Sequence, residues 1–460
     1  MSYLITNEIF SDYLNCKYKV FLKFTGKTAT KTEYEKLQKR LLQKYRQYVR
    51  KSLISKKYMN GGIIEKITLS DIVKQKFGFG FFIREKFKDL KVHFDALIKE
   101  DSSCTSYVPV SFIRKERVQI NDKLNLAFCG AVIGERLNTI PQFGRIIYGN
   151  NISMVRVNFD VLIPKVTSIV MALRNLIASD NSPQMHLNKH CKICEFRAKC
   201  YRNAVENDDL SLLSGLNQKK IQKINNKGIF TVNQYSYTFK PRRRRKSRDK
   251  KITCYPELKA LAIRENKIYV HGTPELPHSK VEIFLDIEGL PDKNFYYLIG
   301  LIINENGNFH DYSFWANSSN EEDNLFYQLQ KELNKYRDYI IYHFGNYEKK
   351  YLKSMSKKLE NSQSRKVKNI INRCYDLLPV FVSNIYIPTY SNGLKDIANF
   401  LGFSWTDKSG SGIQSIIWRE KWELSRSNII EDKLKQYNKD DCLALVNVKN
   451  FVSENRYRNE

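Results

Sequence analysis

The sequence predicts an α/β protein of two or three domains, and its length, composition and patterning each support that class. The 460 residues exceed what a single hydrophobic core usually organises. Hydrophobic residues make up 42% and aromatic residues 13% of the chain, which is typical of globular rather than disordered proteins. Short apolar runs that suit strands alternate with longer helical patterns.

The charge balance favours a polyanionic partner. Lysine and arginine number 77 against 48 acidic residues, which gives a formal net charge of +29. Such an excess is typical of proteins that bind nucleic acid, although the codon bias of a low-GC genome also enriches lysine. We expect nucleic acid as the partner, with DNA favoured over RNA.

We expect a cytoplasmic protein without a membrane partner. Residues 1–8 lack the basic and apolar segments of a secretory signal, and no apolar run reaches the ~18 residues that a membrane span needs. The nine cysteines should therefore be mostly reduced, and clustered cysteines are more readily ligands than disulfides.

The first part of the chain predicts helices followed by an α/β core. Residues 1–60 have helical patterns, and residues 60–100 turn toward strands. The expected order is then a strand at 92–98, a strand at 107–112, a helix at 122–133, a strand at 144–149 and a helix at 161–177. That order is typical of an α/β nuclease core.

Three cysteines in the spacing C-x2-C-x5-C follow this core: Cys191, Cys194 and Cys200. A C-x2-C turn brings two thiolates within reach of one metal site, and clustered thiolates suit zinc or iron–sulfur. Nearby, only His190 and His186 offer a fourth ligand. Three unrelated buried cysteines are the alternative interpretation.

Cys16, in the context Tyr-Leu-Asn-Cys-Lys-Tyr, together with the distant C-x2-C-x5-C resembles the iron–sulfur type of RecB-like nucleases. The resemblance implies a [4Fe–4S] cluster held by Cys16, Cys191, Cys194 and Cys200, in a role that joins the two ends of the domain. Zinc is the alternative metal. The remaining cysteines match no ligand position and are predicted to be packed thiols: Cys104, Cys129, Cys254, Cys374 and Cys442.

The same resemblance implies DNA cleavage by an Asp on one strand and a Glu-x-Lys on the next. Asp95 stands where the Asp belongs, but the following strand reads Pro109-Val110-Ser111-Phe112 and carries neither acid nor lysine. We therefore expect this domain to have lost catalysis and to persist as a DNA-binding or scaffold module. A second enzymatic interpretation keeps the cutting here, at Asp95.

Residues 208–236 resemble a helix–hairpin–helix, in which backbone N–H groups of a tight turn contact phosphate. Gly215 and Asn217 form the expected turn, with Asn217 in the place of a second glycine because asparagine tolerates left-handed backbone. An ordinary helical linker is the alternative.

A basic run at residues 240–251 follows, with Arg242, Arg243, Arg244 and Arg245 at its centre. We expect it to track phosphates with salt-sensitive affinity. A solvated linker is the alternative.

Asp286 and Glu288 lie two residues apart in the apolar segment 281–289, which reads as a buried strand. Strand alternation puts both carboxylates on one face. Unpaired carboxylates in an apolar sheet cost several kcal/mol each, and a divalent cation is a common remedy. A strand edge that faces solvent is the simpler alternative.

The segments after this strand predict a second α/β domain. Strands are expected at 296–303 and 312–316, a helix at 320–336 and a strand at 338–344, which is the opening order of a ribonuclease-H-like fold. Glu348 begins the next helix. Tyr437 and Asp441 are four apart on a late helix and share a face.

These residues resemble the tyrosine-containing branch of the DEDD 3′–5′ exonucleases. Asp286 and Glu288 match its first motif, Tyr437 and Asp441 match its last, and Glu348 stands where an Asp is usual. The resemblance implies two Mg²⁺ or Mn²⁺ ions held by the four acids, with Tyr437 orienting water.

Taken whole, the chain resembles a family of RecB-like nucleases. The implied fold is a RecB-like, restriction-endonuclease-type domain at 1–205, a helix–hairpin–helix at 206–240, a basic linker and connecting segment at 241–279, and a ribonuclease-H-like exonuclease domain at 280–460. We expect a metal-dependent nuclease, as a 3′–5′ exonuclease on DNA. The alternative is a non-catalytic nucleic-acid-binding adaptor for repair in which both sites are degraded.

Overall fold

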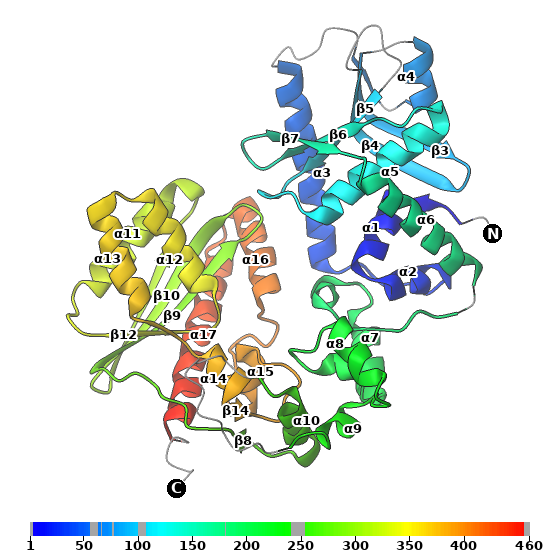
Figure 1. Cartoon of the computed structure of the whole chain (residues 1–460). Helices are drawn as coiled ribbons and strands as arrows, with labels where there is room; N and C mark the ends of the chain where they lie inside the picture. The colour runs from blue at the N-terminus through cyan, green and yellow to red at the C-terminus, as the bar shows by residue number, and fades with distance from the viewer. Residues whose placement is uncertain are drawn as a thin grey trace. The chain divides into compact units, whose positions relative to one another are not determined.

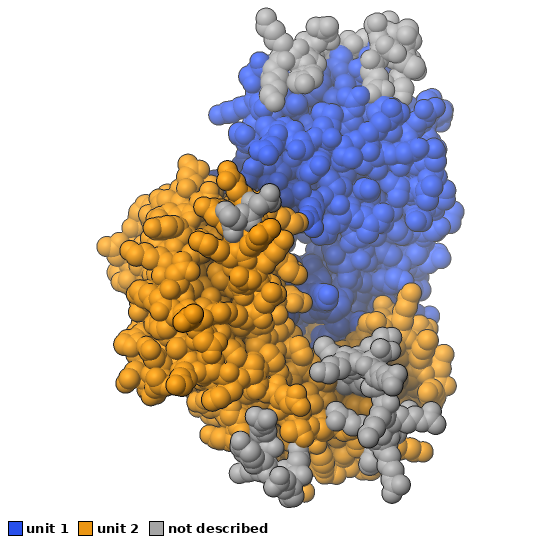
Figure 2. Space-filling model, turned by 60° about the vertical axis from the view of Figure 1, so that its left-hand side comes forward, with its two compact units in different colours: residues 1–198 blue, residues 199–460 orange. Residues whose placement is uncertain are grey.

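The computed structural model describes residues 3–55, 63–65, 67–75, 78–99, 107–179, 181–240 and 254–454. The chain divides into two compact units, Met1–Ala198 and Lys199–Glu460, which Figure 2 shows in blue and orange. The finer division predicted from the sequence, with boundaries at 205, 240 and 279, stays a prediction. In the described segments, no helix is both long enough and apolar enough to cross a lipid bilayer.

Unit 1 is built around a mixed seven-stranded sheet in the order β2-β3-β4-β5-β6-β7, with β1 beside β4. Strand β4 runs antiparallel to β3 and to β5, whereas the pairs β2–β3, β1–β4 and β5–β6 are parallel. The strands are β1 Ile5–Thr6, β2 Ile63–Glu65, β3 Phe79–Phe87, β4 Leu90–Lys99, β5 Tyr107–Ile113, β6 Phe143–Tyr148 and β7 Ser153–Asn158.

The helices of unit 1 pack on this sheet through apolar faces. They are α1 Asn7–Asn15, α2 Lys17–Phe24, α3 Glu33–Ser55, α4 Leu69–Gln75, α5 Ile120–Leu137, α6 Leu162–Ala178 and a 3-10 turn Lys189–Ile193. The predicted helices and strands of this region are therefore confirmed. The sequence interpretation missed α4 and β7, and the exposure of most residues of β7 explains why its apolar signal is weak.

Unit 2 begins with small helices and then a second sheet. The first elements are the end of α7 Arg197–Glu206, a 3-10 turn Leu210–Leu212, α8 Gln218–Asn225, α9 Val232–Ser236, α10 Pro256–Glu265 and β8 Tyr269–Val270. α9 and α10 contribute Val232 and Ala260 to a small apolar cluster with Leu213. Strand β8 pairs with β14 Ile385–Tyr386, which ties this part to the rest of unit 2.

The main sheet of unit 2 has five strands in the order β11-β10-β9-β12-β13. Strands β9 Val281–Leu290, β10 Phe295–Glu305 and β11 Asn308–Trp315 form the predicted antiparallel meander. β12 Ile340–His343 then pairs parallel to β9, and β13 Cys374–Asp376 parallel to β12. β9 is buried along almost its whole length because it is the central strand and is covered on both faces.

Helices lie on both faces of this sheet (Figure 1). α11 Glu322–Leu333, α12 Tyr347–Lys358 and α13 Asn361–Asn372 lie on one side, whereas α16 Gly412–Ser425 and α17 Asn428–Glu454 lie on the other. The shorter α14 Leu378–Ser383 and α15 Leu394–Phe400 complete the unit. α17 packs against β9 and β10, which brings the end of the chain to the strand that carries Asp286.

Candidate active site

Asp286 and Glu288 project from the same face of β9, as strand alternation predicted, and α17 brings Asp441 to them. One oxygen from each of these three carboxylates lies within 4.8 Å of the others. A cavity of about 350 Å³ opens over the group. Its walls include Gly289, Phe344, Tyr347, Glu348, Leu394, Lys395, Gly412, Ile416 and Tyr437.

Neutral donors hold the two carboxylates of β9. The amide of Asn438 donates to Oδ2 of Asp286 at 2.6 Å. The hydroxyl of Ser415, on α16, donates to Oε2 of Glu288 at 2.7 Å. Each bond fixes one carboxylate oxygen without adding a positive charge, and a backbone hydrogen bond from Ile287 also reaches the carboxylate of Asp286.

Asp441 is held in the same way. The indole Nε1 of Trp405 donates to its Oδ1 at 2.8 Å, and Tyr437 also forms a hydrogen bond with this carboxylate. Burial, reinforced by neighbouring carboxylates, raises the pKa of Tyr437 well above its ordinary value. The phenol therefore acts as a hydrogen-bond partner and not as a base at neutral pH.

The carboxylates destabilise one another's charged forms. Burial first, and then the charge of Glu348, raise the pKa of Asp286 to about 7. Burial and the charge of Asp286 raise the pKa values of Glu288 and Asp441 well above the ordinary range. Uncompensated buried acids of this kind are relieved by a bound cation, so the donor set fits a divalent metal.

Glu348 lines the cavity from the first turn of α12 but lies outside the 4.8 Å group. Its Oε2 is 3.4 Å from Nδ1 of His343, a fully buried residue at the end of β12. Burial raises the pKa of Glu348 to about 8 and lowers that of His343 to about 4. The sequence interpretation treated His343 as a core histidine only; the fold also makes it the neighbour of Glu348.

Several residues at this site were not predicted. Asn438, Ser415 and Trp405 each contact a carboxylate, and Lys395 lines the cavity with its Nζ donating to the carbonyl of Gly410 at 2.6 Å. The sequence could have indicated Asn438, because it lies inside the Tyr437-x3-Asp441 motif, directly after Tyr437. Ser415 and Trp405 lie in segments that carried no motif.

Asp440 is separate from the cavity, as its position on the helix suggested. Its carboxylate accepts the backbone N–H of Thr406 at 2.7 Å. Asp440 therefore fixes the loop that carries Trp405.

Asp95, the candidate of unit 1, is engaged in structural contacts. Its Oδ2 accepts the backbone N–H of Phe112 at 2.8 Å, and its Oδ1 lies 2.6 Å from Nε of Arg46. The described residues place no further pair of acids or histidines around it that would complete a metal site. An arginine and a backbone amide already compensate this buried carboxylate.

Three of the four predicted cluster ligands lie in unit 1. Cys16 caps the start of α2, where its Sγ accepts the N–H of Lys19 at 3.4 Å. Its pKa is raised by burial and also by the nearby Cys191. Cys194 is buried, and Cys200 lies in α7, in the first residues of unit 2. Among the described residues, no three cysteines bring their sulfur atoms within 4.8 Å of one another.

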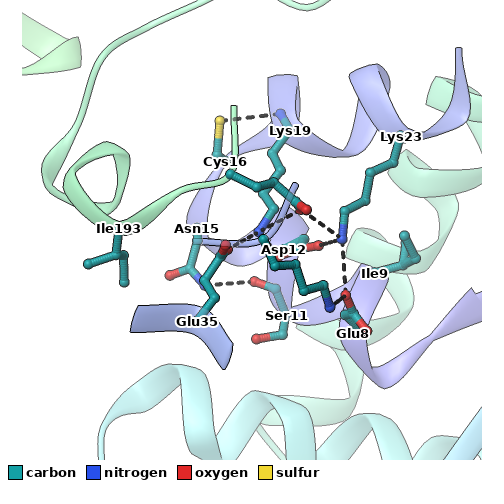
Figure 3. A network of polar contacts seen from close by, with 12 residues as sticks. Glu8, Ile9, Ser11, Asp12, Asn15, Cys16, Lys19, Lys23, Glu35 and Ile193 are labelled. Atoms are coloured by element: carbon teal, nitrogen blue, oxygen red, sulfur yellow. Dashed lines mark hydrogen bonds and ion pairs between the residues drawn. The ribbon is translucent and has the colours of Figure 1, made fainter. Parts of the chain in front are cut away.

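A buried ionic network surrounds the cysteine segment (Figure 3). Lys19 is only 6% exposed and lies 2.9 Å from Asp12, 3.4 Å from Glu195 and 3.5 Å from Glu35. Lys23 adds contacts to Asp12 at 2.6 Å and to Glu195 at 3.4 Å. These ion pairs join the first helices of unit 1 to the segment around residue 194, far away in the sequence.

The five other cysteines were predicted to be packed thiols. Cys129, Cys374 and Cys442 are buried. Cys254 is exposed, so the prediction is wrong for this residue, which begins the described segment before α10. Cys104 lies outside the described residues.

The predicted helix–hairpin–helix turn differs from its sequence interpretation. Gly215 has a positive φ of 91°, as expected for a turn glycine. Asn217 is extended, with φ of −95°, and its side chain accepts the N–H of Lys220 at 3.0 Å as the cap of α8. The left-handed conformation expected for Asn217 is therefore wrong, because the capping bond requires extended backbone. The segment before the turn is a short 3-10 helix.

The four arginines of the predicted basic run lie outside the described residues: Arg242, Arg243, Arg244 and Arg245.

A comparison with protein-family models matches the C-terminal part of the chain. A family model described as RNase_H_2, of the RNase_H superfamily, matches residues 283–453. No curated protein matches the chain. One solved structure, described as "Crystal structure of SSO0001", covers 43% of this chain and 85% of its own, with 14% identity and a TM-score of 0.25, which is too low to support a structural argument. Residues 283–453 therefore form a ribonuclease-H-like domain, which indicates nuclease-type chemistry and a nucleic-acid partner.

Proposed function

We propose that this protein is a metal-dependent 3′–5′ exonuclease on DNA whose chemistry lies in the ribonuclease-H-like domain. The observation that carries the proposal is the convergence of Asp286, Glu288 and Asp441 in one cavity, with one oxygen of each within 4.8 Å of the others. Burial and mutual repulsion raise the pKa values of these three carboxyl groups, so a divalent cation would stabilise their charged forms.

The chain's own acids would hold two divalent cations. Asp286, Glu288 and Asp441 would be the principal ligands, and Glu348 would approach from α12. Mg²⁺ or Mn²⁺ bound here would supply Lewis-acid stabilisation of the attacking and leaving oxygens of a phosphodiester. Tyr437, protonated beside Asp441, would orient the attacking water through its hydroxyl.

The remainder of the chain would bind DNA. Its net charge of +29 supports attraction to a polyanion, and the turn at Gly215 and Asn217 would contact phosphates before the basic run Arg242, Arg243, Arg244 and Arg245. In this proposal the RecB-like first domain, residues 1–205, is catalytically degraded. The pairing of Asp95 with Arg46 supports this assignment.

A [4Fe–4S] cluster on Cys16, Cys191, Cys194 and Cys200 is a second part of the proposal. This part is supported by the resemblance of Cys16 and the C-x2-C-x5-C spacing to the iron–sulfur type of RecB-like nucleases. Anaerobically purified protein should be brown and absorb near ~400 nm. A colourless protein that contains stoichiometric zinc would overturn this part alone.

A cleavage assay tests the nuclease. Purified protein is incubated with end-labelled single- and double-stranded DNA and RNA in Mn²⁺. We expect shortening of DNA from the 3′ end, and loss of it in Asp441→Asn but not in Asp432→Asn, an exposed acid on the same helix. Cleavage that requires Asp95 and not Asp441 would place the chemistry in unit 1. DNA binding without Mn²⁺-dependent cleavage would support the adaptor alternative.

A further inference from the structure

An asparagine interrupts the apolar face with which α17 covers the sheet. Asn438 is 1% exposed, and a buried amide costs about 1–3 kcal/mol when its hydrogen bonds are not made. The other buried positions of this face include Leu434, Leu445, Val448 and Val452. An apolar residue would pack here without the desolvation cost of an amide, so packing alone does not explain the asparagine.

The amide makes two bonds to one residue. Nδ2 of Asn438 donates to the carboxylate Oδ2 of Asp286 at 2.6 Å and to the backbone carbonyl of Asp286 at 3.2 Å. Together the two bonds tie the carboxylate to its own strand and restrict rotation of the side chain. The amide engages Oδ2 of the carboxylate and does not bond to Oδ1.

A glycine on the neighbouring strand makes this approach possible. Gly300 of β10 is the register partner of Asp286 on β9. A Cβ on Gly300 would lie 2.0 Å from Oδ1 of Asn438, well inside contact distance. Any side chain at position 300 would therefore push the amide of Asn438 away from the sheet.

We propose that Asn438, admitted by Gly300, is a positioning residue that presents one oxygen of Asp286 to the divalent cation. This inference rests on the metal site of the proposed function. A neutral amide suits the role because it orients the carboxylate without competing for its charge, as lysine or arginine would. Partners of metal ligands commonly contribute 10–100-fold to metal affinity.

Mn²⁺ binding by titration calorimetry tests the inference without depending on catalysis. We expect Asn438→Ala to weaken Mn²⁺ binding by about 10–100-fold. The matched control is Asn447→Ala, on the same helix, because the side-chain Oδ1 of Asn447 has no hydrogen-bond partner among the described residues. In cleavage assays, Asn438→Ala should raise the Mn²⁺ concentration for half-maximal rate and approach the wild-type rate at saturation, which a general loss of structure would not do.

The double variant tests the link to Gly300. Gly300→Ala alone should weaken binding as much as Asn438→Ala, and combining the two should cost no more than either, since both remove the same amide. Mn²⁺ affinity of Asn438→Ala within twofold of wild type, with Asp286→Asn abolishing binding, would overturn the positioning role. Additive losses in the double variant would overturn the role of Gly300. Wild-type protein without Asp286-dependent Mn²⁺ binding would overturn the metal site itself.

Discussion

Replacing Asp286 by Asn should stabilise the metal-free protein, and more strongly at pH 8 than at pH 5. Burial and the charge of Glu348 raise the pKa of Asp286 from 3.8 to about 7. The asparagine keeps the shape of the carboxylate and can still accept the amide hydrogen bond of Asn438 through its own oxygen. It removes only the charge.

The direction in which stability changes with pH follows from proton binding to Asp286. Between pH 3.8 and about pH 7 the folded protein retains a proton on Asp286 that the unfolded chain has released. Stability therefore falls as pH rises through this window and levels off above it. The loss corresponds to at most about 4 kcal/mol at pH 8, at ~1.36 kcal/mol per pH unit.

Thermal unfolding in EDTA measures the effect. If the variant gains only a quarter of this maximal stabilisation, about 1 kcal/mol, the Tm of a domain of this size would rise by about 2–4 °C. Asp286→Asn should show at least this rise at pH 8 and a smaller one at pH 5. Added Mn²⁺ should raise the wild-type Tm at pH 8 but not that of the variant.

The exposed Asp432→Asn on α17 is the control and should change neither Tm. Equal Tm differences at pH 5 and pH 8 would show that the charge of Asp286 is not the cause. A less stable Asp286→Asn at pH 8 would refute the reasoning entirely.

Three further substitutions probe the rest of the chain. Lys19→Met should lower the free energy of unfolding of unit 1 by about 3–5 kcal/mol, because it leaves the carboxylates of Asp12 and Glu195 buried near one remaining lysine. An unchanged denaturant midpoint of unit 1 would contradict this expectation. Arg419→Leu should cost about 2–5 kcal/mol in denaturant unfolding of unit 2, because the fully buried guanidinium donates to the backbone carbonyls of Ala316 and Asn317, and only the carbonyl of Asn317 keeps another donor, Arg426. Asn217→Ala should cost about 1 kcal/mol and speed amide hydrogen exchange in α8, whereas Asn217→Asp should keep the cap.

Local rules were sufficient for much of the fold. Apolar runs and period-two alternation located β9 and its neighbours, and placed Asp286 and Glu288 on one face. Helical spacing placed Tyr437 and Asp441 together. These predictions depend only on residues close in sequence, where backbone geometry fixes the direction of side chains.

Local rules failed where a second segment decided the outcome. Asn217 is an exception, because its extended backbone follows from a local capping bond to Lys220, three residues later, that competes with the expected turn conformation. The mostly exposed β7 was missed because its place in the sheet depends on pairing with β6. Glu348 begins the predicted helix, yet its contact with His343 follows from the way β12 and α12 meet.

The sequence by itself determined which carboxylates are buried on β9 and α17, because hydrophobic periodicity specifies a buried face. Only the tertiary structure decided what holds them. The donors are Asn438, Ser415 and Trp405, and each is separated in sequence from the carboxylate it contacts by more than 30 residues. Gly300 contributes because it lacks a side chain, which leaves room for the amide of Asn438. Such contacts follow from packing between distant elements, and no local pattern encodes them.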